Sequence, residues 1–375
     1  MTLQQLYNEK GTQFKLSLLA GQKGLHRNVT KVYYLEDLLI SDWARDGELI
    51  VTTAMMNTRE PDWILKFVKS VQSFHPSGIL INIGGYLEEV PANVIEYCDQ
   101  VDLPLLSFPW EVILQDLISD ITIYIFETEQ LENNIAQSFF NAIFVPDNRE
   151  EYEKCLNKYQ FDQYDMLFSA VFEISSNDLQ RHRLTTRLKN LFHDAVFIQH
   201  FRETILIFYQ HNLDDISDVI AGELNEWQIL FPNASVHVGI GSPVNQYQNI
   251  SESYQKAKIS LSIAENTNVS LVSFSRLGIL GILATGEKQL LQNYYDQVLT
   301  PLELYDQTHD TAYVETLENY ITCNCDAGAA AEKLFVHRNT LNYRLRKICD
   351  ITGDNLNEQE VIFSYHLAFL VKKCL

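Results

Sequence analysis

The sequence predicts a multidomain protein in which two α/β regions precede an all-helical C-terminal region. Two stretches, before about residue 115 and over residues 160–285, alternate short apolar strand patterns with helical periodicity, whereas residues 286–375 contain helical patterns only. The chain has 375 residues, 46% of them hydrophobic, with only 15 Gly and 9 Pro. This composition suits several globular domains with their own cores and excludes a largely disordered or fibrous protein.

The N-terminal region is predicted to contain a parallel sheet. Residues 48–53 and 78–83 have the apolar runs of buried strands, and residues 62–74 between them have the spacing of an amphipathic helix. Residues 94–98 and 103–108 repeat this order of elements. Strand, crossover helix and strand imply parallel pairing, so an α/β domain is expected over residues 1–126.

A helical connector follows. Residues 114–144 lack Gly and Pro and carry an apolar stripe, so one long helix is expected, which either pairs with its copy in a dimer or packs on its own domain. Pro146-Asp147-Asn148 then breaks the pattern. The predicted division after the first domain is a connector at 127–158, a second α/β domain at 159–285 and a helical domain at 286–375.

The second α/β domain combines strands, a hairpin and amphipathic helices. Strands are expected at 166–174 and 235–240, a hairpin at 196–201 with 204–209, and helices at 178–192, 214–229 and 254–264.

Residues 326–348 form the most informative segment, because their pattern is that of two helices joined by a short turn. Ala327, Ala330, Ala331 and Leu334 share one face of the first helix, where small side chains permit close helix packing. Phe335-Val336-His337 is the expected turn. A second helix starts at Arg338, and Leu341, Leu345 and Ile348 form its buried stripe.

The second helix carries polar and basic residues suited to reading DNA. Asn339, Asn342, Tyr343 and Arg346 are expected opposite the stripe, Thr340 and Lys347 beside them, and Arg338 and Arg344 at the edges, near enough to reach phosphates. Asn and Arg make bidentate contacts to base edges, and flanking cations hold the backbone. The predicted DNA-binding residues are His337, Arg338, Asn339, Thr340, Asn342, Tyr343, Arg344, Arg346 and Lys347.

Charge makes this segment unusual within the chain. The whole protein has a formal net charge of −21, which opposes binding to nucleic acid, yet residues 327–348 hold five basic side chains and one acidic side chain. A charge run of this kind is also compatible with an ordinary solvated helix face.

Residues 334–348 with Thr352-Gly353 closely resemble the C-terminal helix-turn-helix of PucR-family transcriptional regulators. Residues 18–53, 86–91 and 103–105 resemble the family's N-terminal domain, and residues 236–283 its central GGDEF-like domain. The resemblance implies a cytoplasmic, ligand-responsive regulator that binds double-stranded DNA as a homodimer or higher homo-oligomer. It further implies an activator of genes for purine, amino-acid or related nitrogen metabolism, with a purine-degradation product or an amino acid as effector.

Two positions depart from the family pattern. Asn342 stands where members commonly carry Arg, which leaves one cation fewer for DNA, and Gly328 stands where a Ser is frequent, which leaves Asp326 as the expected helix cap. The last helix is expected to begin with a capping box made by Asn357 and Glu360. That helix packs on the helix-turn-helix or forms a dimer contact, and a two-fold dimer would read two half-sites about one DNA turn apart.

The carboxyl ends of the predicted parallel strands are the expected effector site, because ligands bind there in α/β folds. This places Thr52, Thr53, Asn82 and Gly84 near a ligand, although the same residues also suit loops and caps. No cofactor is expected.

Enzymatic activity is not expected. A nucleotide cyclase requires a Gly-rich turn and paired carboxylates, whereas the corresponding hairpin reads His200-Phe201-Arg202-Glu203-Thr204, and Glu173 with Asp178 is not a matched metal pair. The six cysteines include Cys323 and Cys325, whose spacing differs from a Cys-x-x-Cys knuckle, so free thiols are expected and no metal site.

Two other functions remain open from the sequence. One is an α/β enzyme whose helical tail serves oligomerisation, and the other is a protein-binding adaptor that uses the acidic surface. The first residues lack a basic stretch followed by an apolar run, and no window has the length of a membrane span, which predicts a cytoplasmic protein without membrane contact.

Overall fold

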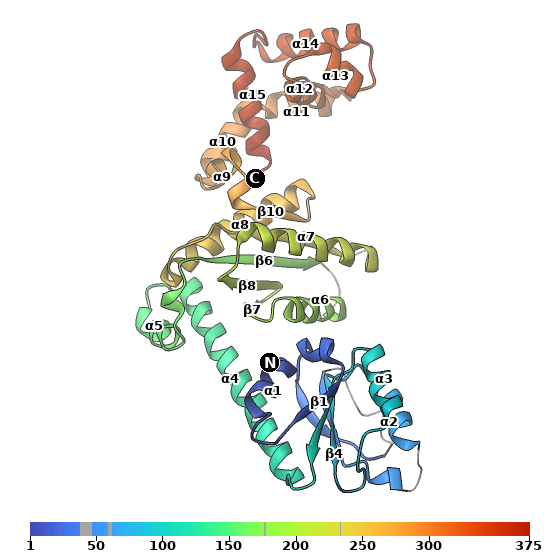
Figure 1. Cartoon of the computed structure of the whole chain (residues 1–375). Coiled ribbons are helices and arrows are strands. Elements are labelled where there is room, and N and C mark those ends of the chain that lie inside the picture. The colour runs from blue at the N-terminus through green and yellow to red at the C-terminus, as the bar shows by residue number, and fades with distance from the viewer. Residues whose placement is uncertain (38–46, 59–61, 176–177, 233) are drawn as a thin grey trace. The chain divides into compact units, whose positions relative to one another are not determined.

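The computed structural model describes residues 1–37, 47–58, 62–175, 178–232 and 234–375 (Figure 1). The chain divides into two compact units. The first comprises Met1–Phe140, Glu150–Leu156 and Leu179–Val196, and the second comprises Asn141–Arg149, Asn157–Asp178 and Phe197–Leu375. The four-part division predicted from the sequence is finer and stays a proposal.

The first unit is built on a five-stranded sheet with the order β1-β5-β4-β3-β2. Four strands, β2 to β5, run parallel, and β1 pairs antiparallel with β5 at the edge. The strands are β1 Ser17–Ala20, β2 Lys31–Tyr34, β3 Glu48–Thr52, β4 Gly78–Ile83 and β5 Leu105–Pro109.

Helices cover both faces of this sheet. On one face, α2 (Trp63–Gln72) and α3 (Ala92–Gln100) bury an apolar cluster that includes Phe67 and Val94. On the other face, α1 (Leu3–Lys10) and the first part of α4 (Leu114–Phe144) bury a second cluster (Figure 1). Both faces of each central strand are therefore buried, which explains the continuous apolar runs of β3 and β4.

The strand order bears on the expected ligand site. Strands β2, β3, β4 and β5 follow one another across the sheet without a reversal. Successive right-handed crossovers then place α2 and α3 on the same face. A crevice at a topological switch point requires a reversal of the strand order, which strands β2 to β5 do not have. Any ligand site at the carboxyl edge of this sheet must therefore be formed by the side chains at the strand ends.

The second unit contains another five-stranded sheet, with the order β10-β9-β6-β8-β7. Strand β6 pairs antiparallel with both β8 and β9, and β10 pairs parallel with β9. Helix α8 (Ile250–Thr267) packs across β6 and β9. The strands are β6 Leu167–Ser175, β7 Val196–His200, β8 Glu203–Tyr209, β9 Ser235–Ile240 and β10 Leu271–Ser273, and the long helix α7 spans Leu213–Leu230.

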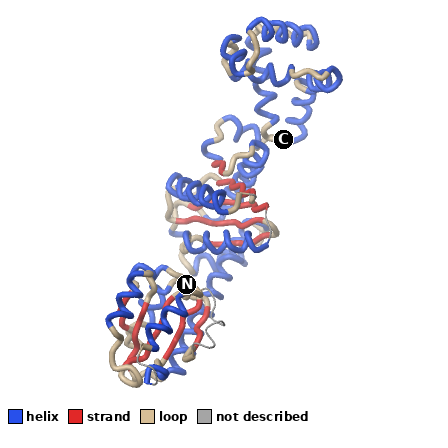
Figure 2. The backbone as a smooth tube through the Cα atoms, turned by 90° about the vertical axis from the view of Figure 1, so that its right-hand side faces the viewer, coloured by secondary structure: helices blue, strands red, loops and turns tan. Residues whose placement is uncertain are grey.

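The C-terminal part of the second unit is entirely helical, as Figure 2 shows. Its main core joins α11, α12, α14 and α15 around Leu317, Ile348 and Phe369, and a smaller cluster joins α13 to α14. The helices are α9 Ile279–Ala284, α10 Lys288–Val298, α11 Thr300–His309, α12 Tyr313–Thr322, α13 Ala327–Lys333, α14 Arg338–Thr352 and α15 Gln359–Lys372.

The predicted fold class is confirmed, and several element boundaries agree to the residue. The helix expected over 114–144 is α4, the strand expected over 235–240 is β9, and α14 begins at the predicted Arg338. The sequence did not predict the edge strands β1, β2 and β10 or the helix α5 (Arg149–Lys158). It also did not predict that α6 would belong to the first unit. Helix α6 itself (Asp178–Leu191) was expected.

The predicted capping box of the last helix is wrong. The N-cap of α15 is Glu358, which makes no side-chain cap, and Asn357 lies in the preceding turn. There the backbone N–H of Asn357 donates to the side-chain oxygen of Asn355 at 3.1 Å. The local Asx turn competes with the cap, and the N-cap lies one residue later than predicted.

Close packing of α8 on β9 depends on Gly239. A Cβ atom at this position would lie 2.1 Å from the backbone oxygen of Ala257. We expect Gly239→Ala to lower the free energy of unfolding by about 1 to 3 kcal/mol, because the helix has to move away from the sheet. Urea denaturation of the full-length protein measures this change.

Gly222 supplies the matched control, because a Cβ atom there would meet nothing within 4 Å. Gly222→Ala lies within α7 and should raise the free energy of unfolding by about 0.5 to 1 kcal/mol through helix propensity. Equal effects of the two substitutions would contradict the packing argument.

Candidate nucleic-acid interface

Helices α13 and α14 form a compact pair whose contact depends on small side chains. The carboxylate of Asp326 caps α13, accepting hydrogen bonds from the backbone N–H groups of Gly328 at 2.7 Å and Ala329 at 3.2 Å. This agrees with the predicted cap. Ala330, Ala331 and Leu341 bury one another in the contact between the two helices.

The turn between these helices orients the start of α14. Phe335 has φ of 53°, and its side chain is 97% exposed. His337 is the N-cap of α14, and its Nδ1 accepts a hydrogen bond from the backbone N–H of Asn339 at 3.2 Å. A residue predicted to contact DNA thus has a structural role at the helix start as well.

The polar face of α14 lies opposite its buried stripe. Leu341 and Ile348 are completely buried, and Leu345 packs beside them. All of the predicted DNA-binding residues lie on α14 or at its N-cap. Those that are exposed are His337, Arg338, Asn339, Thr340, Tyr343 and Arg346, whereas Asn342, Arg344 and Lys347 are partly buried.

The basic side chains of α14 differ in what they contact. Arg344 donates from Nη1 to the hydroxyl of the buried Thr316 on α12 at 3.1 Å. Lys347 forms an ion pair of 3.6 Å with Asp350. Within the part of the chain that the structure describes, Arg338 and Arg346 have no hydrogen bond or ion pair, so both guanidinium groups are available to an external anion.

Helical geometry explains the position of Arg344. At about 100° per residue, Arg344 projects only about 40° from the direction of Ile348 and therefore faces α12. Arg346 projects close to Asn339 and Asn342 on the opposite face. The interface that α14 offers consists of side chains with base-reading chemistry flanked by free cations.

The residues predicted to hold an effector are brought together at the carboxyl edge of the first sheet, but most are occupied locally. The hydroxyl of Thr52 accepts from the backbone N–H of Ala54 at 3.1 Å, and Thr53 donates its N–H to the carboxylate of Glu36. The amide nitrogen of Asn82 donates to the backbone oxygens of residues 108 and 109, each at 3.3 Å. Gly84 has φ of 92°, as a turn after a strand requires.

Sequence reasoning missed the side chains that surround these residues. Tyr34 ends β2, Tyr86 follows β4 and Trp110 follows β5, and all three are large and partly exposed. Aromatic residues directly after consecutive parallel strands are the signal that would have indicated them, because these strand ends share one edge of the sheet.

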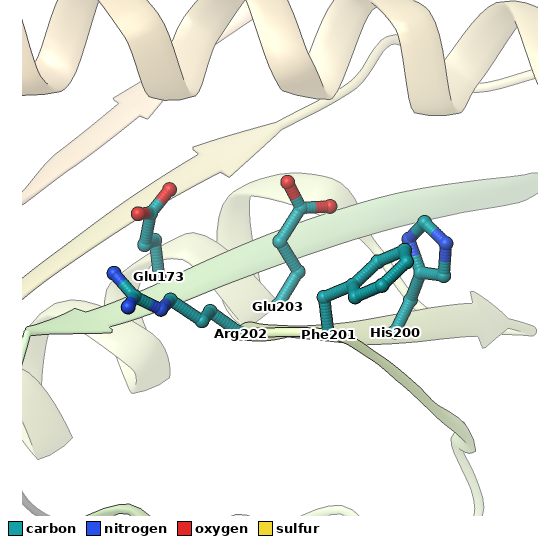
Figure 3. A pocket seen from close by; sticks show the side chains of 5 residues that line it. All are labelled: Glu173, His200, Phe201, Arg202 and Glu203. Carbon is teal, nitrogen blue, oxygen red and sulfur yellow. The ribbon is translucent and has the colours of Figure 1, made fainter.

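The tip of the central hairpin carries large side chains in place of glycine. Its tip is Phe201-Arg202, with φ of 52° at Phe201, and Glu203 accepts hydrogen bonds from Tyr254 at 3.1 Å and from Lys258. Glu173 lies opposite Glu203 in the sheet, a pairing that the sequence did not indicate. Both carboxylates point to the same side of the sheet beside a cavity of about 410 Å³ (Figure 3).

Burial and the neighbouring Glu173 raise the pKa of Glu265 above its usual value. Glu173 lies beside this second acid, and Glu203 is engaged by Tyr254 and Lys258.

The cysteines of the helical region are free thiols, and burial raises the pKa of Cys325. Among the described residues, no group of three or more His, Cys, Asp or Glu side chains is placed to hold a metal ion. No helix in the described part of the chain combines the length and apolar character needed to cross a bilayer.

Two α/β regions followed by a helix-turn-helix define the architecture of a multidomain DNA-binding protein. The sequence pattern of the Purine catabolism regulatory protein-like family matches residues 5–125, that of a GGDEF-like domain matches 146–263, and that of the PucR C-terminal helix-turn-helix domain matches 313–371. Together these three matches cover most of the chain, which combines a PucR-type N-terminal domain, a GGDEF-like domain and a PucR-type helix-turn-helix domain.

Two curated relatives of this chain are transcriptional activators. The DNA-binding transcriptional activator AdeR of Bacillus subtilis (strain 168) is 32% identical over 162 residues, which are 42% of this chain and 38% of AdeR. The proline-responsive transcriptional activator PutR of the same strain is 32% identical over 143 residues, 37% of this chain and 34% of PutR. The alignments thus span little more than a third of either relative.

A solved structure, the regulator of polyketide synthase expression from Bifidobacterium adolescentis, aligns with 64% of this chain and 92% of its own. Its sequence identity of 14% and TM-score of 0.27 are too low to support a comparison.

Arg344 and Arg346 should separate stability from recognition. Arg344→Ala removes the hydrogen bond to Thr316, so we expect the free energy of unfolding to fall by about 1 kcal/mol or more. Arg346→Ala removes an exposed side chain without a described partner and should change the free energy of unfolding by less than about 0.5 kcal/mol. Urea denaturation compares the two variants, and a larger loss for Arg346→Ala would show that the assignment of roles is reversed.

Proposed function

We propose that this chain is a ligand-responsive transcriptional regulator that binds double-stranded DNA through α14. The observation that carries the proposal is the polar face of α14, where Asn339, Asn342 and Arg346 lie together opposite the buried Leu341 and Ile348. The matches to the PucR helix-turn-helix domain and to transcriptional activators support the same function.

Recognition would follow from the chemistry of this face. The N-terminal half of α14 enters the major groove, where Asn339 and Asn342 offer paired donors and acceptors to adenine and Arg346 offers a fork to guanine. Arg338 and Lys347 lie beside this face and neutralise phosphates. His337, Thr340 and Tyr343 complete the contact surface, and Arg344 contributes by holding α14 against α12.

The local charge makes this possible in an acidic protein. Residues 327–348 carry a net charge of +4, from five basic side chains and one acidic, within a chain of net charge −21. The remainder of the chain repels DNA, so a duplex is accepted only at this end. Association should therefore depend strongly on salt.

The wider regulatory role is also proposed. The curated relatives are activators, one of them responsive to proline, and the family name refers to purine catabolism. We therefore propose activation of genes for purine, amino-acid or related nitrogen metabolism in response to a small-molecule effector. A homodimer or higher homo-oligomer in the cytoplasm would present two copies of α14 to two half-sites.

We infer that the central domain is not an active cyclase. Its hairpin tip carries the side chains of Phe201 and Arg202, where close approach to a phosphate needs glycine, and Glu203 is engaged by Lys258 and Tyr254. The domain is proposed to have a structural or dimerising role.

Base reading by α14 is tested by binding to genomic DNA. Fragments retained by the full-length protein should share an inverted or direct repeat, and Asn339→Ala, Asn342→Ala and Arg346→Ala combined should remove the enrichment. Arg346→Ala alone should weaken binding to the enriched site by about 1 to 3 kcal/mol and leave random DNA nearly unaffected. Fluorescence anisotropy at fixed salt measures both affinities.

Two controls distinguish the outcomes. Arg338→Ala should weaken binding to both DNAs equally and reduce the slope of log K against log salt by about 1, as a phosphate contact does. Lys288→Ala, an exposed cation on α10, should have no effect. Absence of any enriched sequence, with or without nitrogen metabolites, would refute autonomous DNA recognition.

The inference on the central domain is tested by incubating the full-length protein with GTP and Mg²⁺ or Mn²⁺. We expect no cyclic dinucleotide by chromatography, because the paired carboxylates are held by Lys258, Tyr254 and Glu265. Product that disappears in Glu203→Gln would contradict this inference and leave DNA recognition by α14 untouched.

A further inference from the structure

Three aromatic side chains gather at the carboxyl edge of the N-terminal sheet. Tyr34, Tyr86 and Trp110 are 46%, 42% and 51% exposed, and they come from the ends of β2, β4 and β5. One exposed aromatic residue is ordinary on a protein surface, but several at one edge of a sheet mark a binding surface.

The rings of Tyr86 and Trp110 form a corner. Their planes lie at 90° and their centroids are 5.5 Å apart. The indole rests against the backbone of Gly85, where a Cβ atom would lie 2.1 Å from the ring. Glycine is therefore required for Trp110 to take this position, and the corner is built into the backbone.

A carboxylate lies beside Tyr34 at the same edge of the sheet. Glu36 accepts hydrogen bonds from the backbone N–H groups of Thr53 and, at 3.2 Å, of Met55, which fix its position. The pKa of Tyr34 is raised by burial, by the charge of Glu36 and by its hydrogen bond to Glu36, with a further contribution from Tyr86. Glu36 and Tyr86 are thus both close enough to Tyr34 to act on its pKa.

A fourth electron-rich group lies at the same edge. The side chain of Asn82 is 3% exposed, and its amide nitrogen is directed to the backbone oxygens at the end of β5. Its oxygen Oδ1 is buried and has no hydrogen-bond partner within the described chain. Because a buried acceptor without a partner is costly, this oxygen adds to the preference of the edge for a positive or N–H-bearing group.

We propose that this edge binds an organic ammonium ion. The faces of Tyr86 and Trp110 attract a cation through their quadrupoles, and Glu36 supplies the compensating charge. An anionic ligand would meet a carboxylate and two aromatic faces and be disfavoured. The inference rests on the proposed function in one respect, because it takes the bound ammonium ion to be the effector of the proposed regulator.

The test uses the full-length protein and three probes, tetramethylammonium, choline and methylammonium. Calorimetry measures binding, and quenching of tryptophan fluorescence reports on the indole. We expect choline to bind about 10-fold more tightly than its neutral isostere 3,3-dimethylbutan-1-ol, since cation–π attraction is lost without the charge. Acetate should not bind.

Variants locate the site. Trp110→Leu and, separately, Tyr86→Leu should reduce choline affinity about 10-fold or more, whereas Tyr86→Phe keeps the ring and should retain binding. Phe126→Leu replaces another exposed aromatic residue, on α4, and should have no effect. Circular dichroism and urea denaturation establish that each variant is folded. Because Trp110→Leu and Tyr86→Leu are tested separately, either variant still tests the site if the other does not fold.

Three results would overturn the inference: no binding of any ammonium ion, equal binding of the neutral isostere, or choline binding that survives both leucine variants. None of these measurements involves DNA. Intact operator binding without ammonium binding would defeat this inference alone, and ammonium binding without operator binding would defeat the proposed regulatory function alone.

Discussion

The contact between α13 and α14 determines what this protein can present to DNA. Ala330 and Ala331 are small enough for α14 to approach, which buries Leu341, while Ile348 is buried in the core that α14 forms with α12 and α15. Once these two positions face inward, the helical repeat turns Asn339 and Arg346 outward. The side chains of the interface are thus oriented by apolar packing that contains no recognition chemistry.

Charge imposes the second constraint on the same helix. A chain with 49 acidic and 28 basic side chains can approach a polyanion only through a local excess of cations. The structure divides the cations of α14 between two tasks, since Arg344 is tied to Thr316 while Arg338 and Arg346 have no described partner. Local net charge therefore overstates the number of cations available to phosphates.

Much of the fold could be predicted because its elements have strong periodicity. Helix α4 has a long apolar stripe and strand β9 places an apolar residue at every second position, whereas β1, β2 and β10 have only three or four residues, too few for a period to emerge. The polar face of α14 was also predictable from spacing. The contact of Arg344 with α12 was not, because it depends on a distant residue, and neither was the corner of Tyr86 and Trp110, which depends on strand pairing. The cap at Asn357 failed because a neighbouring Asx turn offered the backbone another partner.

Regulation by a ligand requires the ligand to bind two conformations with different affinity, and α4 offers a continuous element that could carry such a difference. Trp110 lies four residues before α4, and the last residues of this helix belong to the second unit, where Phe144 stacks 4.5 Å from His200 at the central hairpin. A ligand that fixes Trp110 thus acts four residues before a helix whose last residues belong to the second unit. A tenfold shift between two states needs about 1.4 kcal/mol, which lies between the about 0.5 to 1 kcal/mol of an exposed cation–π contact and the about 2 kcal/mol of a desolvated one. In energy, an aromatic corner that is desolvated by its ligand is therefore sufficient to shift such an equilibrium.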